Sequence, residues 1–523
     1  MNTKKDNPII VGLDIGTTKI VAIAGRRNEY DKIEILGHGF STSSGVNHGM
    51  VLNIEECNKC IEAALLDCKT NNPFLEIKEV YVGVAGHHIK SIQTQGKRVI
   101  QNEDDVVARK DVEMLIKEQF KTSIHPGDQI IDVIPQEFMV DSHGPFLRDN
   151  VVGMTANNLR ANFHIITADK DAIKNINRAV TRSSLGIKDF ELQPLASAAA
   201  VMSPEDIEMG VAIIDIGGGT TDLAVFHDGI IKHTAVIPRA GVNITQDIKS
   251  GLGVLKSQAE QMKKKFGVAL ADEVSSNTFI SIPSIRGHKP KEISAKNLAK
   301  IIQARMEEIL DHVQHHLRQL NLEDKLHGGV ILTGGGSQLK HLKQLTEFKL
   351  GLPARIGFPN QHIAGDEARN LNQPMFATCI GLILRGYDDV DTRRFTNFQA
   401  NTLFEEENET IETAKTPQAD IVEVELAGLF PELEETKVEE IEEVVEEDTQ
   451  DPVVDDNNQH LAQDLENFFA LEGDEIPEEI GAVPPKVEDE PREKRTNGLK
   501  KVFNLISKNI MQIFDDEDDE KLN

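Results

Sequence analysis

The chain has 523 residues, enough for two or more domains with separate cores, and a formal net charge of −30. Residues 401–497 hold 32 Asp and Glu against 6 Lys and Arg, so the rest of the chain is nearly neutral. A nearly neutral body has no basic surface for nucleic acid, whose non-specific binding depends on Lys and Arg, and this class of partner is excluded.

Short Val- and Ile-rich runs alternate with helical patterns from residue 9 to about residue 390, which is typical of an α/β fold. Strands are expected at 9–15, 19–25, 33–37, 80–84, 211–216, 222–226, 230–236 and 329–333. Helices are expected at 54–70, 105–120, 169–184, 243–251, 254–266, 295–320 and 337–348.

One motif occurs twice in this series, as "LDIGTTKI" at 13–20 and as "IDIGGGTTDL" at 214–223. Each copy predicts a β-hairpin whose glycines let backbone N–H groups surround an anion and whose threonine hydroxyls add donors. A single copy is also compatible with an ordinary tight turn, but two copies favour a phosphate clamp. The residues expected to bind phosphate are Gly16, Thr17, Thr18 and Lys19 in the first copy, and Gly217, Gly218, Gly219, Thr220, Thr221 and Asp222 in the second.

Asp14 and Asp215 precede the two glycine turns and are expected to face a bound polyphosphate. A carboxylate in that position requires a divalent cation, so the sequence predicts Mg²⁺ held by Asp14 and Asp215 through water. Hydrolysis needs a group that orients water at the terminal phosphate, and Gln193 or Asp215 is the candidate. Nothing in the sequence sets a rate of hydrolysis, so a bound nucleotide is expected to act mainly as a switch, in at most a weak ATPase.

Four cysteines are too few for a disulfide framework, and an aspartate interrupts the first apolar segment before a signal peptide can develop. Both features predict a cytoplasmic location. Cys57, Cys60 and Cys68 share one helical stretch, where a Cys-x-x-Cys pair suggests redox or metal chemistry. No second pair of ligands follows nearby, so ordinary helix packing is the favoured interpretation. No run reaches the roughly 20 apolar residues of a membrane span.

Two later segments extend the predicted nucleotide site. "GGVILTGGGSQLKHL" at 328–342 predicts a strand, a glycine turn and the start of a helix, with Gly334, Gly335, Gly336 and Gln338 able to admit a nucleoside. In "SQAEQMKKKFG" at 257–267, Glu260 and Lys263 lie one helical turn apart. They are candidates for ribose or adenine contacts, and a solvated ion pair is the alternative.

Past residue 400 the periodic apolar pattern fades and acidic residues dominate. High charge and few aromatic residues predict a disordered linker. It is followed by an amphipathic helix at 498–514, whose apolar residues share an arc of about 120°. This helix predicts a membrane anchor, and packing on the body or on a neighbouring chain is the alternative. The apolar face comprises Leu499, Val502, Phe503, Ile506, Ile510, Ile513 and Phe514.

The three glycine motifs, in this order, resemble those of the actin, Hsp70 and sugar-kinase superfamily of ATP-binding proteins. "GVNHGMVLNIEE" at 45–56, "IIDVIPQEFMVD" at 130–141 and "VVGMTANNLRANFHIIT" at 151–167 lie outside those motifs and resemble the bacterial cell-division family FtsA. The likeness extends over about residues 8–390. The amphipathic helix at 498–514 is a second, separate point of resemblance.

This resemblance implies an actin-like two-lobed fold that binds ATP and Mg²⁺, polymerises, and anchors the FtsZ ring to the cytoplasmic face of the inner membrane at the division site. It also implies a small subdomain that contacts later division proteins, and a second subdomain that receives the C-terminal peptide of FtsZ. The basic stretch of the second subdomain suits an acidic peptide, although a solvated helix face is the alternative. Its candidate residues are Arg286, Lys289, Lys291 and Arg305.

Two other functions remain open at this stage, an actin-like adaptor of a pilus or secretion machine and an ATPase of the Hsp70 or sugar-kinase type. The disordered linker and the amphipathic helix at 498–514 favour the cell-division family, because a pilus adaptor would not need them. The expected divisions are the first lobe at 1–84, the small subdomain at 85–165, the return to the first lobe at 166–205, the second lobe at 206–239, its small subdomain at 240–325, the end of the second lobe and return at 326–395, the linker at 396–497, the helix at 498–514 and an acidic tail at 515–523.

Overall fold

The computed structural model describes residues 7–70, 72–101, 104–282, 290–365 and 368–392. The linker and the amphipathic helix predicted at 396–514 lie outside these residues, so both remain predictions. Within the described ranges, no helix combines the length and the apolar character needed to cross a membrane.

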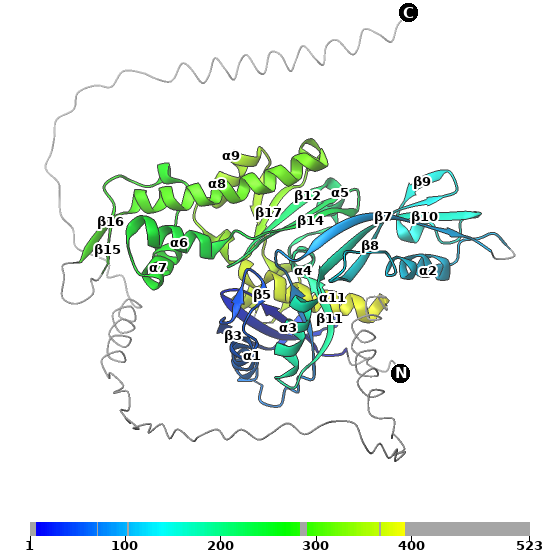
Figure 1. Cartoon of the computed structure of the whole chain (residues 1–523), viewed down its shortest axis with the longest axis horizontal. Coiled ribbons are helices and arrows are strands. Elements are labelled where there is room, and N and C mark those ends of the chain that lie inside the picture. Colours follow the sequence, from blue (N-terminus) through cyan, green and yellow to red (C-terminus); the bar gives the residue numbers. More distant parts are fainter. Residues whose placement is uncertain (1–6, 71, 102–103, 283–289, 366–367, 393–523) are drawn as a thin grey trace, which may run out of the picture. The chain divides into compact units, whose positions relative to one another are not determined.

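Two separate sheets (Figure 1) share one strand order, apart from an extra edge strand in the first, and this duplication accounts for the repeated motif. In each sheet a three-stranded antiparallel meander is extended by two parallel strands on the side of its first strand. The first sheet runs β11 (Gly186–Leu192), β6 (Glu79–Val84), β1 (Ile10–Ile15), β2 (Lys19–Arg27), β3 (Ile33–Thr42) and β19 (Ile363–Ala364). The second runs β18 (Ala354–Ile356), β17 (Gly329–Thr333), β12 (Val211–Ile216), β13 (Thr221–His227) and β14 (Ile230–Ile237).

The central strands of the two sheets are buried on both faces. All six residues of β1 and all six of β12 are buried, which explains their continuous apolar runs. Every strand predicted from the sequence is present, with shifts of a few residues at the ends. Asp14 and Asp215 occupy the fifth position of β1 and β12, so the duplication places them at equivalent points.

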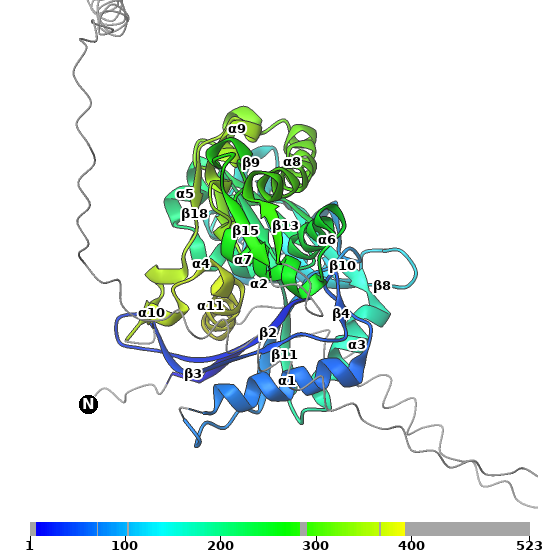
Figure 2. The same ribbon diagram turned by 90° about the vertical axis from the view of Figure 1, so that its left-hand side faces the viewer.

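Two helices lie on one face of the first sheet, and two others join the halves. α1 (Ile54–Cys68), which crosses β2 and β3, packs against α3 (Lys170–Thr181) (Figure 2). α4 (Gln193–Val201) packs against α11 (Ala377–Thr392), and their buried cluster takes side chains from strands of both sheets. The two backbones approach so closely that a Cβ on Gly381 would lie 1.7 Å from the carbonyl oxygen of Ala196.

The cysteines of α1 serve its packing, as the sequence predicted. Cys57 and Cys68 are fully buried in the core of the first half. Burial raises the pKa of the Cys57 thiol to about 12 and that of Cys68 to about 11, so both stay protonated at neutral pH. All four cysteines are free thiols.

The helices of the second half surround a separate core. They are α6 (Gly241–Leu252), α7 (Lys256–Phe266), α8 (Ala295–Leu320) and α9 (Leu342–Leu350), with the hairpin of β15 (Phe279–Ile282) and β16 (Lys291–Ser294). The helix predicted at 337–348 begins later than expected. Residues Gly335–Gln338 form a 3-10 turn and His341 has a φ of 62°, so the α-helix starts only at Leu342.

A third sheet is inserted where the chain crosses from β6 to α3. It has the order β7 (Lys90–Val99), β10 (Asn158–Asp169), β8 (Asp128–Val140) and β9 (His143–Phe146), and α2 (Arg109–Gln119) packs against it. The inserted subdomain contacts the edge strand β14 through polar groups, since Gln136 Nε2 donates to Ile231 O at 2.5 Å and Lys232 pairs with Glu137 at 2.7 Å. The remaining short strands and α-helices of the described residues are β4 (Val46–Asn47), β5 (Met50–Val51), α5 (Pro204–Met209) and α10 (Ala368–Leu371).

Candidate functional site

The two repeated motifs form two matching hairpin loops. The N–H of Gly16 donates to Lys19 O at 3.0 Å, and the N–H of Gly217 donates to Thr220 O at 2.9 Å. We call residues 16–19 and 217–220 the first and second phosphate loops. Their equivalent hydrogen bonds confirm the hairpins predicted from the sequence.

The tips of the two phosphate loops face each other. A Cβ on Gly218 would lie 2.4 Å from Thr18 Oγ1, and one on Gly219 would lie 2.2 Å from Thr17 Oγ1. A side chain at either glycine would force the facing threonine to move. The structure thus brings together loops that stand about two hundred residues apart in the sequence.

The two repeated carboxylates lie behind these loops, each held by a helix. Gln193 Nε2, at the start of α4, donates to Asp14 Oδ1 at 3.0 Å. Asp215 Oδ2 accepts from Ser197 Oγ at 2.5 Å and from Thr378 Oγ1 at 3.1 Å. Because Gln193 and Ser197 belong to α4 and Thr378 belongs to α11, the packing of these helices sets the position of both carboxylates.

Burial makes the charged forms of these groups costly. It raises the pKa of Asp14 to about 6, opposed by the charge of Lys19 and assisted by that of Asp215. It also raises the pKa of Asp215, against the hydrogen bonds from Ser197 and Thr378. Burial lowers the pKa of Lys19, whose ammonium donates to Met375 O and lies 4.9 Å from the centre of the Phe376 ring.

A third carboxylate adds to this charge. Asp222 lies opposite Asp215 in the β12–β13 pair, and burial followed by the charge of Asp215 raises its pKa well above the ordinary value. Its Oδ1 is buried without a hydrogen-bond partner among the described residues. An unpartnered carboxylate oxygen beside two like charges fits a divalent cation.

The same residues do not form a complete set of metal ligands. No group of three or more His, Cys, Asp or Glu side chains in the described part of the chain is arranged to hold a metal ion directly. Mg²⁺ at this site would take most of its ligands from water and phosphate, as Mg²⁺ commonly does in proteins.

The third glycine loop packs behind the second carboxylate. Gly334 has a φ of 80°, and a Cβ there would lie 2.2 Å from Asp215 Oδ1. Gly335 is exposed, and a Cβ there would meet only the Met375 Cβ, at 3.9 Å; Gln338 is exposed as well. The loop therefore joins the site through Gly334, while Gly335 leaves a free backbone surface beside it.

The charged pair on α7 is partly buried against α6, so it is not the solvated pair considered above. Lys263 Nζ donates to Glu260 Oε2 at 2.6 Å, to Gly241 O at 2.9 Å and to Thr245 Oγ1 at 2.8 Å. Gly241 in turn donates its N–H to Gly217 O at 3.2 Å. Lys263 is thus connected to the second phosphate loop through the start of α6.

The residue preceding α6 is not strained. Ala240 has a φ of −166°. This extended conformation is open to any residue.

Of the four residues predicted to bind a partner peptide, two are described. Arg305 donates to both carboxylate oxygens of Asp247 at 2.6 and 3.0 Å, and Lys291 donates to the carbonyls of Leu252 and Gly253 at 2.6 and 3.2 Å. Both cations therefore stabilise the end and flank of α6. Arg286 and Lys289 lie outside the described residues, so the peptide site stays a prediction.

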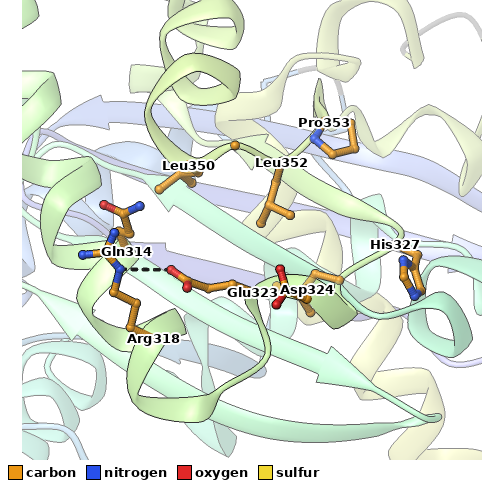
Figure 3. Close-up of a pocket in the computed structure, with 10 residues that line it drawn as sticks. Gln314, Arg318, Glu323, Asp324, His327, Leu350, Leu352 and Pro353 are labelled. Atoms are coloured by element: carbon orange, nitrogen blue, oxygen red, sulfur yellow. Dashed lines mark hydrogen bonds and ion pairs between the residues drawn. The ribbon is translucent and has the colours of Figure 1, made fainter.

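A cavity of about 490 Å³ lies away from all these groups, at the end of α8 (Figure 3). The Arg318 and Glu323 side chains, 3.2 Å apart, close one side of it, and Leu352 and Pro353 line another. None of the predicted site residues lines this cavity. Its size does not make it the functional site, because the buried charges lie at the phosphate loops.

Comparison with known proteins gives the family. The model of "Cell division protein FtsA" matches residues 212–381, and that of the "SHS2 domain inserted in FTSA" matches residues 86–167. Cell division protein FtsA of Pseudomonas aeruginosa is 34% identical over 388 residues, which cover 74% of this chain and 91% of the relative. The Escherichia coli K12 protein of the same name is 33% identical, with 73% and 91% covered.

A solved structure supports the fold alone. The "PilM-PilN type IV pilus biogenesis complex" matches 72% of this chain and 98% of its own with a TM-score of 0.54 and 17% identity. The chain has the actin-like α/β fold expected from its sequence, with an inserted SHS2 subdomain. The identity and coverage of the curated relatives separate it from the pilus adaptor and the other ATPases considered. The chain belongs to the FtsA family of cell-division proteins.

Proposed function

We propose that this cell-division protein binds Mg²⁺·ATP between its two phosphate loops and uses the nucleotide as a switch for assembly into filaments. The observation that supports this proposal is the meeting of the two loops around one buried group of Asp14, Lys19 and Asp215. Because one loop comes from each half, a phosphate that contacts both loops connects the two halves. Binding is thereby coupled to the relative position of the two halves.

Different groups at the loops would bind the phosphates, the Mg²⁺ ion and the attacking water. Backbone N–H groups and threonine hydroxyls would bind the phosphates, and Lys19 would leave the carbonyl of Met375 to approach them. Mg²⁺, when bound, supplies positive charge against Asp14 and Asp215. Gln193 is suited to orient water once its hydrogen bond to Asp14 is released. We expect at most slow hydrolysis.

We further infer that assembled chains link the FtsZ ring to the cytoplasmic face of the inner membrane at the division site and recruit later division proteins. Family membership and the amphipathic pattern of residues 498–514 support this role. Seven apolar side chains contribute about 10 kcal/mol on burial, and ordering the helix backbone costs about as much. One helix therefore binds lipid marginally, and a filament that joins many helices binds firmly.

Asp215→Ala is expected to weaken Mg²⁺·ATP binding by at least about tenfold, since contacts with charged groups are the stronger ones. Filament assembly should weaken with it. Calorimetry with ATP and sedimentation of filaments measure the two effects on one preparation. Asp272→Ala, which removes a fully exposed carboxylate in the second half, is the matched control. Normal filaments without measurable ATP binding would overturn the switch.

Phe503→Asp with Ile506→Asp is expected to release the protein from liposomes, because both side chains lie on the predicted apolar face. ATP binding should not change. Asn504→Asp with Gln512→Asp adds the same charge to the polar face and serves as the control. Liposome flotation compares them, and equal retention of both double variants would refute a membrane anchor.

A further inference from the structure

The turn between β4 and β5 contacts both phosphate loops. His48 Nδ1 lies 2.8 Å from the carbonyl oxygen of Gly219 in the second loop, and the N–H of Gly49 donates to Thr17 Oγ1 of the first loop at 3.2 Å. A carbonyl oxygen only accepts, so Nδ1 must carry the hydrogen. Two consecutive residues of the first half therefore hold a loop from each half.

The backbone of this turn is one that a histidine seldom adopts. His48 has a φ of 46° and Gly49 a φ of 79°, the conformation of a two-residue hairpin turn in which Asn, Asp and Gly are preferred. In this conformation the His48 side chain reaches the second phosphate loop, where it forms the hydrogen bond to Gly219.

The turn packs closely against Ala85 and Gly86. A Cβ on Gly49 would lie 2.5 Å from Ala85 O, and a Cβ on Gly86 would lie 3.3 Å from His48 O. The turn is thus seated on the segment that follows β6, inside the first half. His48 projects from a fixed base toward a loop whose first three residues are glycines.

We propose that His48 is a positioning residue for the second phosphate loop, holding the Gly219 carbonyl so that the loop is ordered before nucleotide binds. Three consecutive glycines leave that loop with unusual conformational freedom. In a trans peptide the C=O and the following N–H point to opposite sides, so fixing the Gly219 carbonyl also fixes the direction of the Thr220 N–H. The proposal rests on the proposed ATP site and adds a residue outside its motifs.

The test compares two substitutions in the full-length protein. His48→Gly tolerates the positive φ but removes the donor. His48→Asn also tolerates it and keeps an N–H donor, Nδ2, at the same number of bonds from Cα as Nδ1 of histidine. Calorimetry with Mg²⁺·ATP should show a dissociation constant about 2- to 10-fold higher for His48→Gly, and a return to within about twofold of wild type for His48→Asn.

Amide hydrogen exchange on the nucleotide-free protein gives a second, independent readout. Residues 217–221 should exchange faster in His48→Gly and at the wild-type rate in His48→Asn. Wild-type affinity and exchange in His48→Gly would overturn the proposal, as would equal losses in both variants. If wild-type protein fails to bind ATP, the proposed function fails, and exchange alone then shows whether His48 orders the loop.

Discussion

Gly381→Ala is expected to lower the free energy of unfolding by at least about 3 kcal/mol, at the upper end of the cost of overpacking. The new Cβ would lie 1.7 Å from the Ala196 carbonyl oxygen. The oxygen belongs to the backbone of α4 and the Cβ is bonded directly to the backbone of α11, so the clash is relieved only if α4 and α11 move apart. The higher helix propensity of alanine, worth up to about 1 kcal/mol, cannot offset this.

Separation of these helices should also impair the proposed nucleotide site. The hydroxyls that hold Asp215 come from Ser197 on α4 and Thr378 on α11. Urea unfolding and ATP calorimetry at a temperature where the variant stays folded measure the two losses. Gly251→Ala is the matched control, because its Cβ would meet only the movable Cδ1 of Ile301, at 2.9 Å. Equal stability of both variants would show that the helices tolerate a wider separation.

Asp14→Asn is expected to change stability and ligand affinity in opposite directions. The pKa of Asp14 is raised from 3.8 to about 6 by burial, so the protonated carboxyl favours folding at low pH. That contribution is lost as the pH rises from about 4 through about 6. At pH 7.5 the neutral amide should therefore stabilise the nucleotide-free protein by up to about 3 kcal/mol, since a difference of one in pKa corresponds to about 1.4 kcal/mol.

The same substitution should weaken Mg²⁺·ATP binding by at least about tenfold, because a neutral amide no longer attracts the cation. Asparagine keeps an acceptor for Gln193, so the local packing is preserved. Urea unfolding at pH 4.5 and 7.5 and calorimetry at pH 7.5 provide the measurements, with the exposed Asp272→Asn as control. Lower stability of Asp14→Asn at pH 7.5 would contradict the assigned cost of the buried charge.

Local patterns were sufficient to predict the parts of the site that each hairpin contains. A buried apolar strand followed by Asp-Ile-Gly and threonines predicts a β-hairpin wherever it occurs, and β1–β2 and β12–β13 are such hairpins. The Cys57 and Cys68 side chains fall on the buried face of α1 for the same reason, since helical periodicity reports which face is apolar. The two copies of one motif also indicated two related halves, which the matching strand orders confirm.

The inserted subdomain was poorly predicted from local pattern. Its strands β7, β8 and β10 carry many polar residues, and parts of β8 and β10 alternate buried and partly exposed positions. Such strands give a weaker signal than the apolar runs of the two main sheets. The family resemblance implied a subdomain there, and the structure supplied its order of strands.

Sequence alone therefore determined the fold class, the two matching glycine hairpins and the carboxylate in each, because each depends on residues a few positions apart. Only the tertiary structure decided which side chains complete the site. Thr378 reaches Asp215 from 163 positions away, and His48 reaches Gly219 from 171. Such contacts depend on how whole helices and sheets pack. The periodicity of a single segment does not predict that packing.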